Sequence, residues 1–204
     1  KHEIGNGRHE IERNNDLIAE LTDAKAFSPK LYPSEKNRAK VLPFQQEAYV
    51  CIAPSSVWFT KQVPIEKWIE LTPTITDKIY LIGAPNDHEM AEKIIEGSSN
   101  KNIVNLCGKL NLLDSVALIE KATMNFVNDS GPMHMASSVN APTTAYYCST
   151  VPDFGFGPLS DQHQVIEVNG LDCKPCGLHG HKACPKNNFE CGLNLKMTPN
   201  GAVI

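Results

Sequence analysis

The sequence predicts an α/β fold, a Rossmann-like parallel sheet with flanking helices, because two kinds of segment alternate along it. Short apolar runs typical of buried strands alternate with amphipathic stretches typical of helices. Such alternation is characteristic of β-α-β units with right-handed crossovers. The expected strands are 49–53, 78–82, 102–106, 124–127 and 143–148, and the expected helices between them are 65–71, 88–95, 113–120 and 133–138.

The composition narrows the class of protein. The chain has 204 residues, 41% hydrophobic and 21% charged, which is enough for one buried core plus an extension. The formal net charge of −4 provides no basic field, so a nucleic-acid partner is not expected. No apolar run is long enough to be a transmembrane segment, and residues 1–5 do not resemble a signal peptide. We therefore expect a cytoplasmic protein.

The first quarter of the chain differs from the rest. Residues 11–21 have the apolar spacing of a helix, whereas residues 24–47 contain three prolines and a charged patch at 35–40 and indicate a linker. This is the clearest expected domain boundary. The segment before it is short and polar, so we expect 1–47 to be the remnant of a preceding domain with its linker.

The turn after the strand 124–127 has the most distinctive sequence. Asn128, Asp129 and Ser130 are followed by Gly131 and by a proline at the start of the next helix. The free amides and positive dipole of that helix N-terminus would suit a phosphate or diphosphate. Asp129 would repel phosphate and would instead meet hydroxyl groups of a sugar or ribose. The alternative is a plain strand-to-helix turn in which Asp129 and Ser130 are only capping residues.

Polar residues also follow the other expected strands. In a parallel sheet all of these positions lie at the edge formed by the carboxyl ends of the strands, where ligands bind. Lys61 could meet phosphate as a point charge, or be an ordinary solvated lysine. Asp87 could bind a ribose or only cap a helix. The polar residues at this edge are Ser55, Ser56, Thr60 and Lys61 after the first strand, Asp87 after the second, Lys109 after the third and Ser149 and Thr150 after the fifth; the last turn leads into a glycine-rich loop at 154–158.

These motifs together resemble glycosyltransferase family 9, which contains the ADP-heptose:lipopolysaccharide heptosyltransferases. The resemblance covers residue 48 to the C-terminus, and residues 10–21 also resemble the helix that closes the first domain of this family. The motifs, in order, are the Pro-Ser-Ser turn with Trp58, Thr60 and Lys61, then Pro64, the 81–83 Leu-Ile-Gly turn followed by Asp87, Gly108-Lys109, the Asn-Asp-Ser-Gly-Pro-Met-His run at 128–134, and Thr150 with Pro152.

The resemblance implies a GT-B glycosyltransferase of which 48–170 is the Rossmann-like donor-binding domain. By this resemblance Lys61, Ser130, Gly131 and His134 would hold the donor diphosphate, and Ser55, Ser56 and Thr60 would line the same pocket. Asp129 would contact the sugar, and Asp87 the ribose. For His134 the alternative is a structural, hydrogen-bonded side chain.

The implied reaction is the metal-independent, inverting transfer of a heptose from ADP-heptose to the lipopolysaccharide inner core, with no cofactor for catalysis. The general base of the family lies in the N-terminal domain, so no catalytic residue is expected here, and the chain alone should bind donor without turnover. The acceptor would be met through that other domain, peripherally at the inner face of the inner membrane. Two departures from the family pattern, at Cys148 and Val151 and at the two residues after Lys61, leave the exact sugar and nucleotide open.

The tail, 171–204, is rich in cysteine. Four of the seven cysteines lie here, and four thiolates could hold a structural zinc ion, with His179 and His181 as further candidate ligands. The alternatives are reduced thiols or disulfides. The candidate ligands are Cys173, Cys176, Cys184 and Cys191.

Two other functions stay open from the sequence. One is a different GT-B sugar-nucleotide enzyme, either a transferase using UDP or GDP sugars or an epimerase. The other is a non-catalytic module whose cysteine-rich tail binds metal and forms an interaction surface. Nucleotide preference and zinc content distinguish these from a heptosyltransferase.

Overall fold

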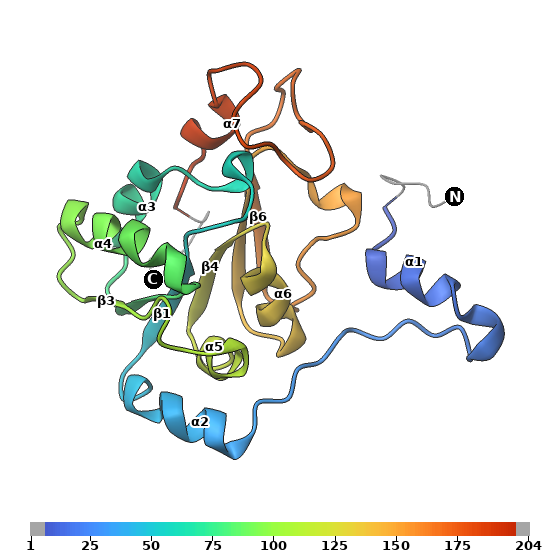
Figure 1. Cartoon of the computed structure of the whole chain (residues 1–204), viewed down its shortest axis with the longest axis horizontal. Coiled ribbons are helices and arrows are strands. Elements are labelled where there is room, and N and C mark those ends of the chain that lie inside the picture. Colours follow the sequence, from blue (N-terminus) through green and yellow to red (C-terminus); the bar gives the residue numbers. More distant parts are fainter. Residues whose placement is uncertain (1–6, 199–204) are drawn as a thin grey trace.

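The computed structural model describes residues 7–198, and the segment compared with a signal peptide lies outside them. It contains a six-stranded, entirely parallel sheet in the order β3-β2-β1-β4-β5-β6. The strands are β1 (Tyr49–Ala53), β2 (Lys78–Leu81), β3 (Ile103–Asn105), β4 (Met124–Asn128), β5 (Thr143–Tyr147) and β6 (His163–Glu167). The predicted α/β class is confirmed (Figure 1).

The helices cover both faces of this sheet, as the two separate apolar clusters show. One cluster joins the sheet to α2 (Glu35–Val41), α5 (Leu112–Ile119) and α6 (Gly131–Ser138). The other joins it to α3 (Ile65–Leu71), α4 (His88–Gly97) and α7 (Glu190–Leu193), and here Trp68 meets the ring of Tyr146 edge-on at 5.3 Å. No helix within 7–198 is long and apolar enough to cross a membrane.

The strand order of the sheet changes direction between β1 and β4. From β1 it adds β2 and β3 on one side, then returns to place β4 on the other side of β1 and continues outward to β5 and β6. At such a switch point the loops after the two central strands diverge and leave a crevice beyond their carboxyl ends. The loops that follow β1 and β4 are those that carry Lys61 and Asp129.

Three elements differ from the prediction. The expected linker contains α2, whose capping box joins Ser34 and Asn37 and whose Val41 is fully buried. The charged patch forms a helix because its side chains find partners on and just after α5: Lys40 lies 2.6 Å from Asp114, and Arg38 pairs with Glu120. The strand β6 and the helix α7 were not predicted.

The first helix, α1 (Glu10–Asp16), stands apart from the sheet (Figure 1). It is shorter than the predicted 11–21, and the apolar side chains Leu17, Ile18 and Leu21 beyond it are exposed. The backbone of Glu10 donates a hydrogen bond of 2.8 Å to the carbonyl of Gly155, and Arg13 donates one of 2.8 Å to the carbonyl of Phe154. These contacts attach α1 to the loop that follows β5.

Candidate functional site

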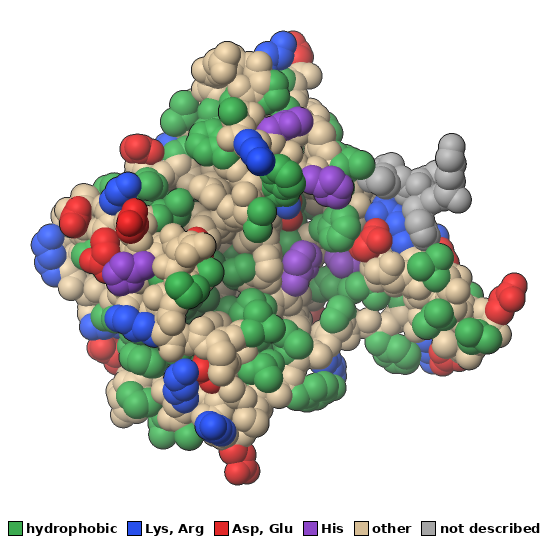
Figure 2. Space-filling view, viewed as in Figure 1, with side chains coloured by type: hydrophobic (Ala, Val, Ile, Leu, Met, Phe, Trp, Pro, Cys, Tyr) green, Lys and Arg blue, Asp and Glu red, His purple; other side chains and the backbone are tan. Residues whose placement is uncertain are grey.

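A pocket of about 250 Å³ lies at the carboxyl ends of β1 and β4, at the switch point. We call it the Lys61 pocket. The residues that line it are Lys61, Asp129, Ser130, Gly131, His134, Val151, Phe154, Phe156, Leu178 and His179. It therefore combines five of the predicted donor residues with a wall of apolar side chains. Figure 2 shows histidine side chains gathered in the hollow between the sheet and α1.

An ion pair lies at the centre of this pocket. The ammonium nitrogen of Lys61 is 2.7 Å from Oδ2 of Asp129, and the two side chains are 17% and 8% exposed. Thr150 donates a hydrogen bond of 2.6 Å to the same carboxylate oxygen. Since the other oxygen of Asp129 is free of both contacts, the carboxylate can hold the lysine and still accept a hydrogen bond from a ligand hydroxyl.

Asn128 fixes the loop that carries Lys61. It is completely buried at the end of β4, and its side-chain oxygen accepts the backbone N–H of Val63 at 2.9 Å. Its amide nitrogen donates to the carbonyls of Ala53 and Ser55 at 3.3 and 3.1 Å. These three bonds tie both ends of the loop after β1 to β4. Asn128 is therefore a positioning residue. It belongs to the 128–134 motif, but no role was predicted for it from the sequence.

The N-terminus of α6 opens into the pocket through Ser130 and Gly131. Extended backbone at Ser130 and a proline at the start of the helix set this geometry. A Cβ built on Gly131 would meet no atom within 4 Å, so the space above the helix start is open. An anion placed there faces the positive end of the helix dipole.

His134 projects from the first turn of α6 into the same pocket. Burial lowers its pKa below the usual value of 6.5, Asp129 acts in the opposite direction, and His9 and Lys61 lower it further. The imidazole is therefore neutral at pH 7 and can donate a hydrogen bond through one nitrogen. Its ring lies 6.5 Å from that of Phe156.

The remaining predicted donor residues do not line this pocket. Ser55 and Ser56 accept hydrogen bonds through their backbone carbonyls, from Asn128 and Gln62 respectively. Thr60 is buried, and its hydroxyl accepts the backbone N–H of His181 at 2.7 Å. Asp87, after β2, accepts the backbone N–H of Ala84 at 2.7 Å, as expected for a capping residue.

The four tail cysteines line a second, smaller pocket of about 10 Å³ together with Thr60 and Ser149, and we call it the cysteine pocket. All seven cysteines are free thiols. Within the described residues, no group of three or more His, Cys, Asp and Glu side chains is placed to hold a metal ion. The four predicted cysteine ligands thus line one pocket, but in the described part of the chain they are not arranged to coordinate a metal ion.

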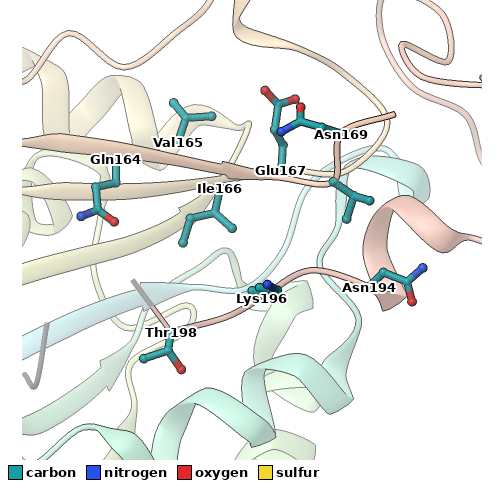
Figure 3. Close-up of a pocket in the computed structure, with 9 residues that line it drawn as sticks. Gln164, Val165, Ile166, Glu167, Asn169, Asn194, Lys196 and Thr198 are labelled. Atoms are coloured by element: carbon teal, nitrogen blue, oxygen red, sulfur yellow. The ribbon is translucent and has the colours of Figure 1, made fainter. Parts of the chain in front are cut away.

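A larger pocket of about 630 Å³ lies elsewhere, between β6 and the segment 194–198 (Figure 3). Its polar side chains are mainly amides, with Glu167 and Lys196 as the charged groups, and it contains none of the predicted donor residues. Glu167 is itself paired with Lys174 at 2.7 Å. We therefore place the candidate site at the smaller Lys61 pocket, where a cation, a carboxylate and a helix N-terminus converge.

The fold and this pocket define a class of protein: a Rossmann-like domain with a polar pocket at the switch point of a parallel sheet. The chain belongs to glycosyltransferase family 9 (heptosyltransferase), whose family model matches residues 1–186.

Two curated relatives have similar sequences. Lipooligosaccharide heptosyltransferase 2 of Haemophilus influenzae is 36% identical over 168 residues, which are 75% of this chain and 48% of the relative. Lipopolysaccharide heptosyltransferase 2 of Escherichia coli is 33% identical over 114 residues, 53% of this chain and 32% of the relative. The matched part of this chain thus spans half or less of either relative.

Solved structures share the fold. The E. coli ADP-heptose lipopolysaccharide heptosyltransferase II has a TM-score of 0.64 at 25% identity, covering 83% of this chain and 54% of that one. A glycosyltransferase family 9 protein from Veillonella parvula has a TM-score of 0.70 at 23% identity, covering 80% and 50%. An E. coli heptosyltransferase solved with ADP has a TM-score of 0.62 at 24% identity, covering 81% and 52%.

Proposed function

We propose that the Lys61 pocket binds the diphosphate of a nucleotide-sugar donor, ADP-heptose, as the donor half of a heptosyltransferase. The observation that carries this proposal is the Lys61–Asp129 pair facing the start of α6 at the switch point. A mobile cation and free helix amides suit a diphosphate, and the adjacent carboxylate suits the hydroxyls of the attached sugar. Membership of the heptosyltransferase family and the ADP in one related structure support the choice of donor.

The proposed reaction is an inverting, metal-independent transfer to the lipopolysaccharide inner core. The acceptor oxygen attacks the anomeric carbon while a base removes its proton, and the bond to the diphosphate breaks. Lys61, the α6 N-terminus and His134 would stabilise the negative charge that develops on the departing diphosphate. The base would lie outside these 204 residues, in the other domain of a GT-B enzyme at the cytoplasmic face of the inner membrane, so this chain alone binds donor without turnover.

The proposed organisation assigns 1–47 to the end of the first domain and its linker, 48–170 to donor binding and 171–204 to the tail. In this arrangement Asp87, one strand away from the Lys61 pocket, would meet the ribose of the nucleotide, and its bond to Ala84 would hold it in place. Ser55, Ser56 and Thr60 would shape the loop that carries Lys61.

The first experiment is a calorimetric titration of the chain with ADP, GDP and UDP, repeated on Lys61→Ala. We expect ADP to bind and Lys61→Ala to weaken binding by about tenfold or more, because a hydrogen bond to a charged group contributes roughly 1.5–3 kcal/mol. Lys67→Ala is the matched control, since Lys67 pairs with Glu70 on α3 at 2.7 Å. Stronger binding of UDP or GDP would favour another sugar-nucleotide enzyme. Equal affinity of both variants would contradict the proposed site.

We propose separately that the tail binds one structural zinc ion, because Cys173, Cys176, Cys184 and Cys191 line the same small pocket. Side-chain rotations would have to bring the thiolates into a tetrahedral set. Elemental analysis of the protein purified without chelator should then give about one zinc per chain, and Cys176→Ser should lose it. Metal-free protein of unchanged stability would contradict this proposal, whereas zinc without any nucleotide binding would favour a metal-binding interaction module.

A further inference from the structure

The cysteine-rich tail contributes to the Lys61 pocket through the segment 177–181, which we call the tail wall. Leu178 and His179 line the pocket together with Lys61, Asp129 and His134. The tail wall comes from a part of the chain far in sequence from the strand-end loops. It therefore brings an imidazole to the pocket from outside the sheet.

Hydrogen bonds hold the tail wall against the loops of the sheet. Thr60, the residue before Lys61, donates its backbone N–H to the carbonyl of His181 at 3.1 Å and accepts the N–H of His181 on its hydroxyl at 2.7 Å. On the other side, the N–H of Cys176 donates to the carbonyl of Ser149 at 2.7 Å, and Ser149 in turn donates to the carbonyl of Thr60 at 3.2 Å. These hydrogen bonds thus fix the tail wall on both sides of His179, at Cys176 and at His181.

Gly180 shows how closely the tail wall approaches Lys61. Its φ is +79°, and a Cβ built on it would lie 3.0 Å from Cγ of Lys61 and 3.1 Å from the Thr60 hydroxyl. That spacing is tight, so any side chain here would press on the stem of Lys61. Gly170 has a similar φ of +76°, but a Cβ there would meet no atom within 4 Å.

His179 is separated from the cysteines by the geometry of the tail. The cysteine pocket is lined by the four thiols, Thr60 and Ser149, and His179 does not line it. His179 instead lines the Lys61 pocket. An imidazole can donate an N–H to a phosphate oxygen in either protonation state. The position of His179 thus favours an anion over a shared metal ion.

We infer that the tail wall closes the donor pocket and that His179 is a binding residue for the donor diphosphate. This inference rests on the proposed function. Lys61 already shares its charge with Asp129, so the diphosphate requires donors beyond the lysine and the α6 N-terminus. His134 and His179 supply them from two sides of the pocket, one from α6 and one from the tail.

The test compares His179→Ala with Lys182→Ala, an exposed neighbour in the same tail that does not line the Lys61 pocket. Calorimetry with ADP and with AMP is the measurement. We expect His179→Ala to weaken ADP binding by about fivefold, the effect of one hydrogen bond of roughly 1 kcal/mol, and to change AMP binding less. Lys182→Ala should match the unmodified chain. Equal ADP affinity of the two variants would overturn the role of His179.

A second pair of variants, Gly180→Ala and Gly170→Ala, tests the wall itself. Both place a side chain at positive φ, so they share the backbone strain, but only Gly180→Ala presses on Lys61 and Thr60. Weaker ADP binding by Gly180→Ala alone supports the tail wall, and equal affinity of the pair contradicts it. If Lys61→Ala loses ADP while the tail variants do not, only this inference fails. If the unmodified chain binds no ADP, the proposed function fails, and the inference fails with it.

Discussion

In the proposed donor site, Asp129 would determine how Lys61 meets a ligand. The ammonium nitrogen of Lys61 is 2.7 Å from Asp129, and Thr150 donates to the same carboxylate oxygen. A diphosphate would compete with Asp129 for the ammonium group and would be repelled by the carboxylate. Because Thr150 remains bonded to Asp129, the carboxylate keeps one partner when Lys61 turns toward phosphate. In the proposed site, the ion pair would thus orient Lys61, and Thr150 would leave Asp129 with a hydrogen-bond donor once Lys61 binds the diphosphate.

At the scale of single residues, part of the site could be predicted from the sequence. Lys61 and Asp129 meet because both follow central strands of a parallel sheet, whose carboxyl ends share one edge. Thr60 was predicted to line the donor pocket, but its hydroxyl faces His181 and it does not line the Lys61 pocket, since the direction of a side chain in an irregular loop follows no periodicity. His179 was expected only near a metal. His179 does not follow a strand of the sheet, so it could not be predicted from the rule that ligands bind at the carboxyl ends of the strands. It reaches the pocket because the tail folds back onto the sheet from a distant segment.

At the scale of elements, the strands and helices of the central units agree with the prediction within about two residues at each end, because their apolar periodicity reflects burial on the sheet. Two of the three missed elements show why their signals were weaker. Strand β6 lies at the edge of the sheet, where two of its five residues are exposed. Helix α2 is charged over most of its length and is fixed by Asp114 and Glu120, which are remote in sequence.

Arg13 contributes a buried side chain to the attachment of α1. Its side chain is 2% exposed, lies 3.1 Å from a carboxylate oxygen of Glu10 and donates to the carbonyl of Phe154. We expect Arg13→Met to release α1 from the loop after β5 and to lower the free energy of unfolding by about 2–3 kcal/mol, because a partly buried carboxylate and a carbonyl lose their donor. Hydrogen exchange of the α1 amides together with urea unfolding would measure both effects.

Arg8 provides the control for this prediction. It pairs with Asp16 at 2.7 Å, but both side chains are about half exposed. Exposed ion pairs contribute roughly 0–1 kcal/mol, so Arg8→Met should change stability little. If Arg8→Met and Arg13→Met unfold at the same urea concentration, the attachment of α1 does not depend on the buried guanidinium.

At the scale of the whole molecule, the Lys61 pocket is assembled from four separate parts of the chain. The loops after β1, β4 and β5 reach it because the switch point brings their strands together, and the tail reaches it by docking on two of those loops. The alternation of strands and helices in the sequence predicts the first three contributions. The fourth depends on contacts among residues without periodicity, such as those of Thr60 and Cys176, and only the structure reveals it.

We expect this assembly to make stability sensitive to mildly acidic pH through His134. Burial lowers its pKa, Asp129 raises it, and His9 and Lys61 lower it further. The unfolded chain, with a pKa of about 6.5, therefore binds the proton more strongly than the folded one. The contribution of His134 to stability is present above about pH 6.5 and is lost as the pH falls below it. Asp114, whose pKa is lowered from 3.8, acts in a separate window below about pH 4.

We therefore expect the free energy of unfolding, measured in urea between pH 8 and pH 5, to fall more steeply for the unmodified chain than for His134→Gln. The glutamine keeps a polar group of similar size but cannot take up a proton, so its curve should be flatter across this range. Parallel curves would show that His134 is not held in its neutral form by the pocket. Because burial is the largest cause of the lowered pKa, a flatter curve for His134→Gln would also report that the pocket around His134 forms in solution.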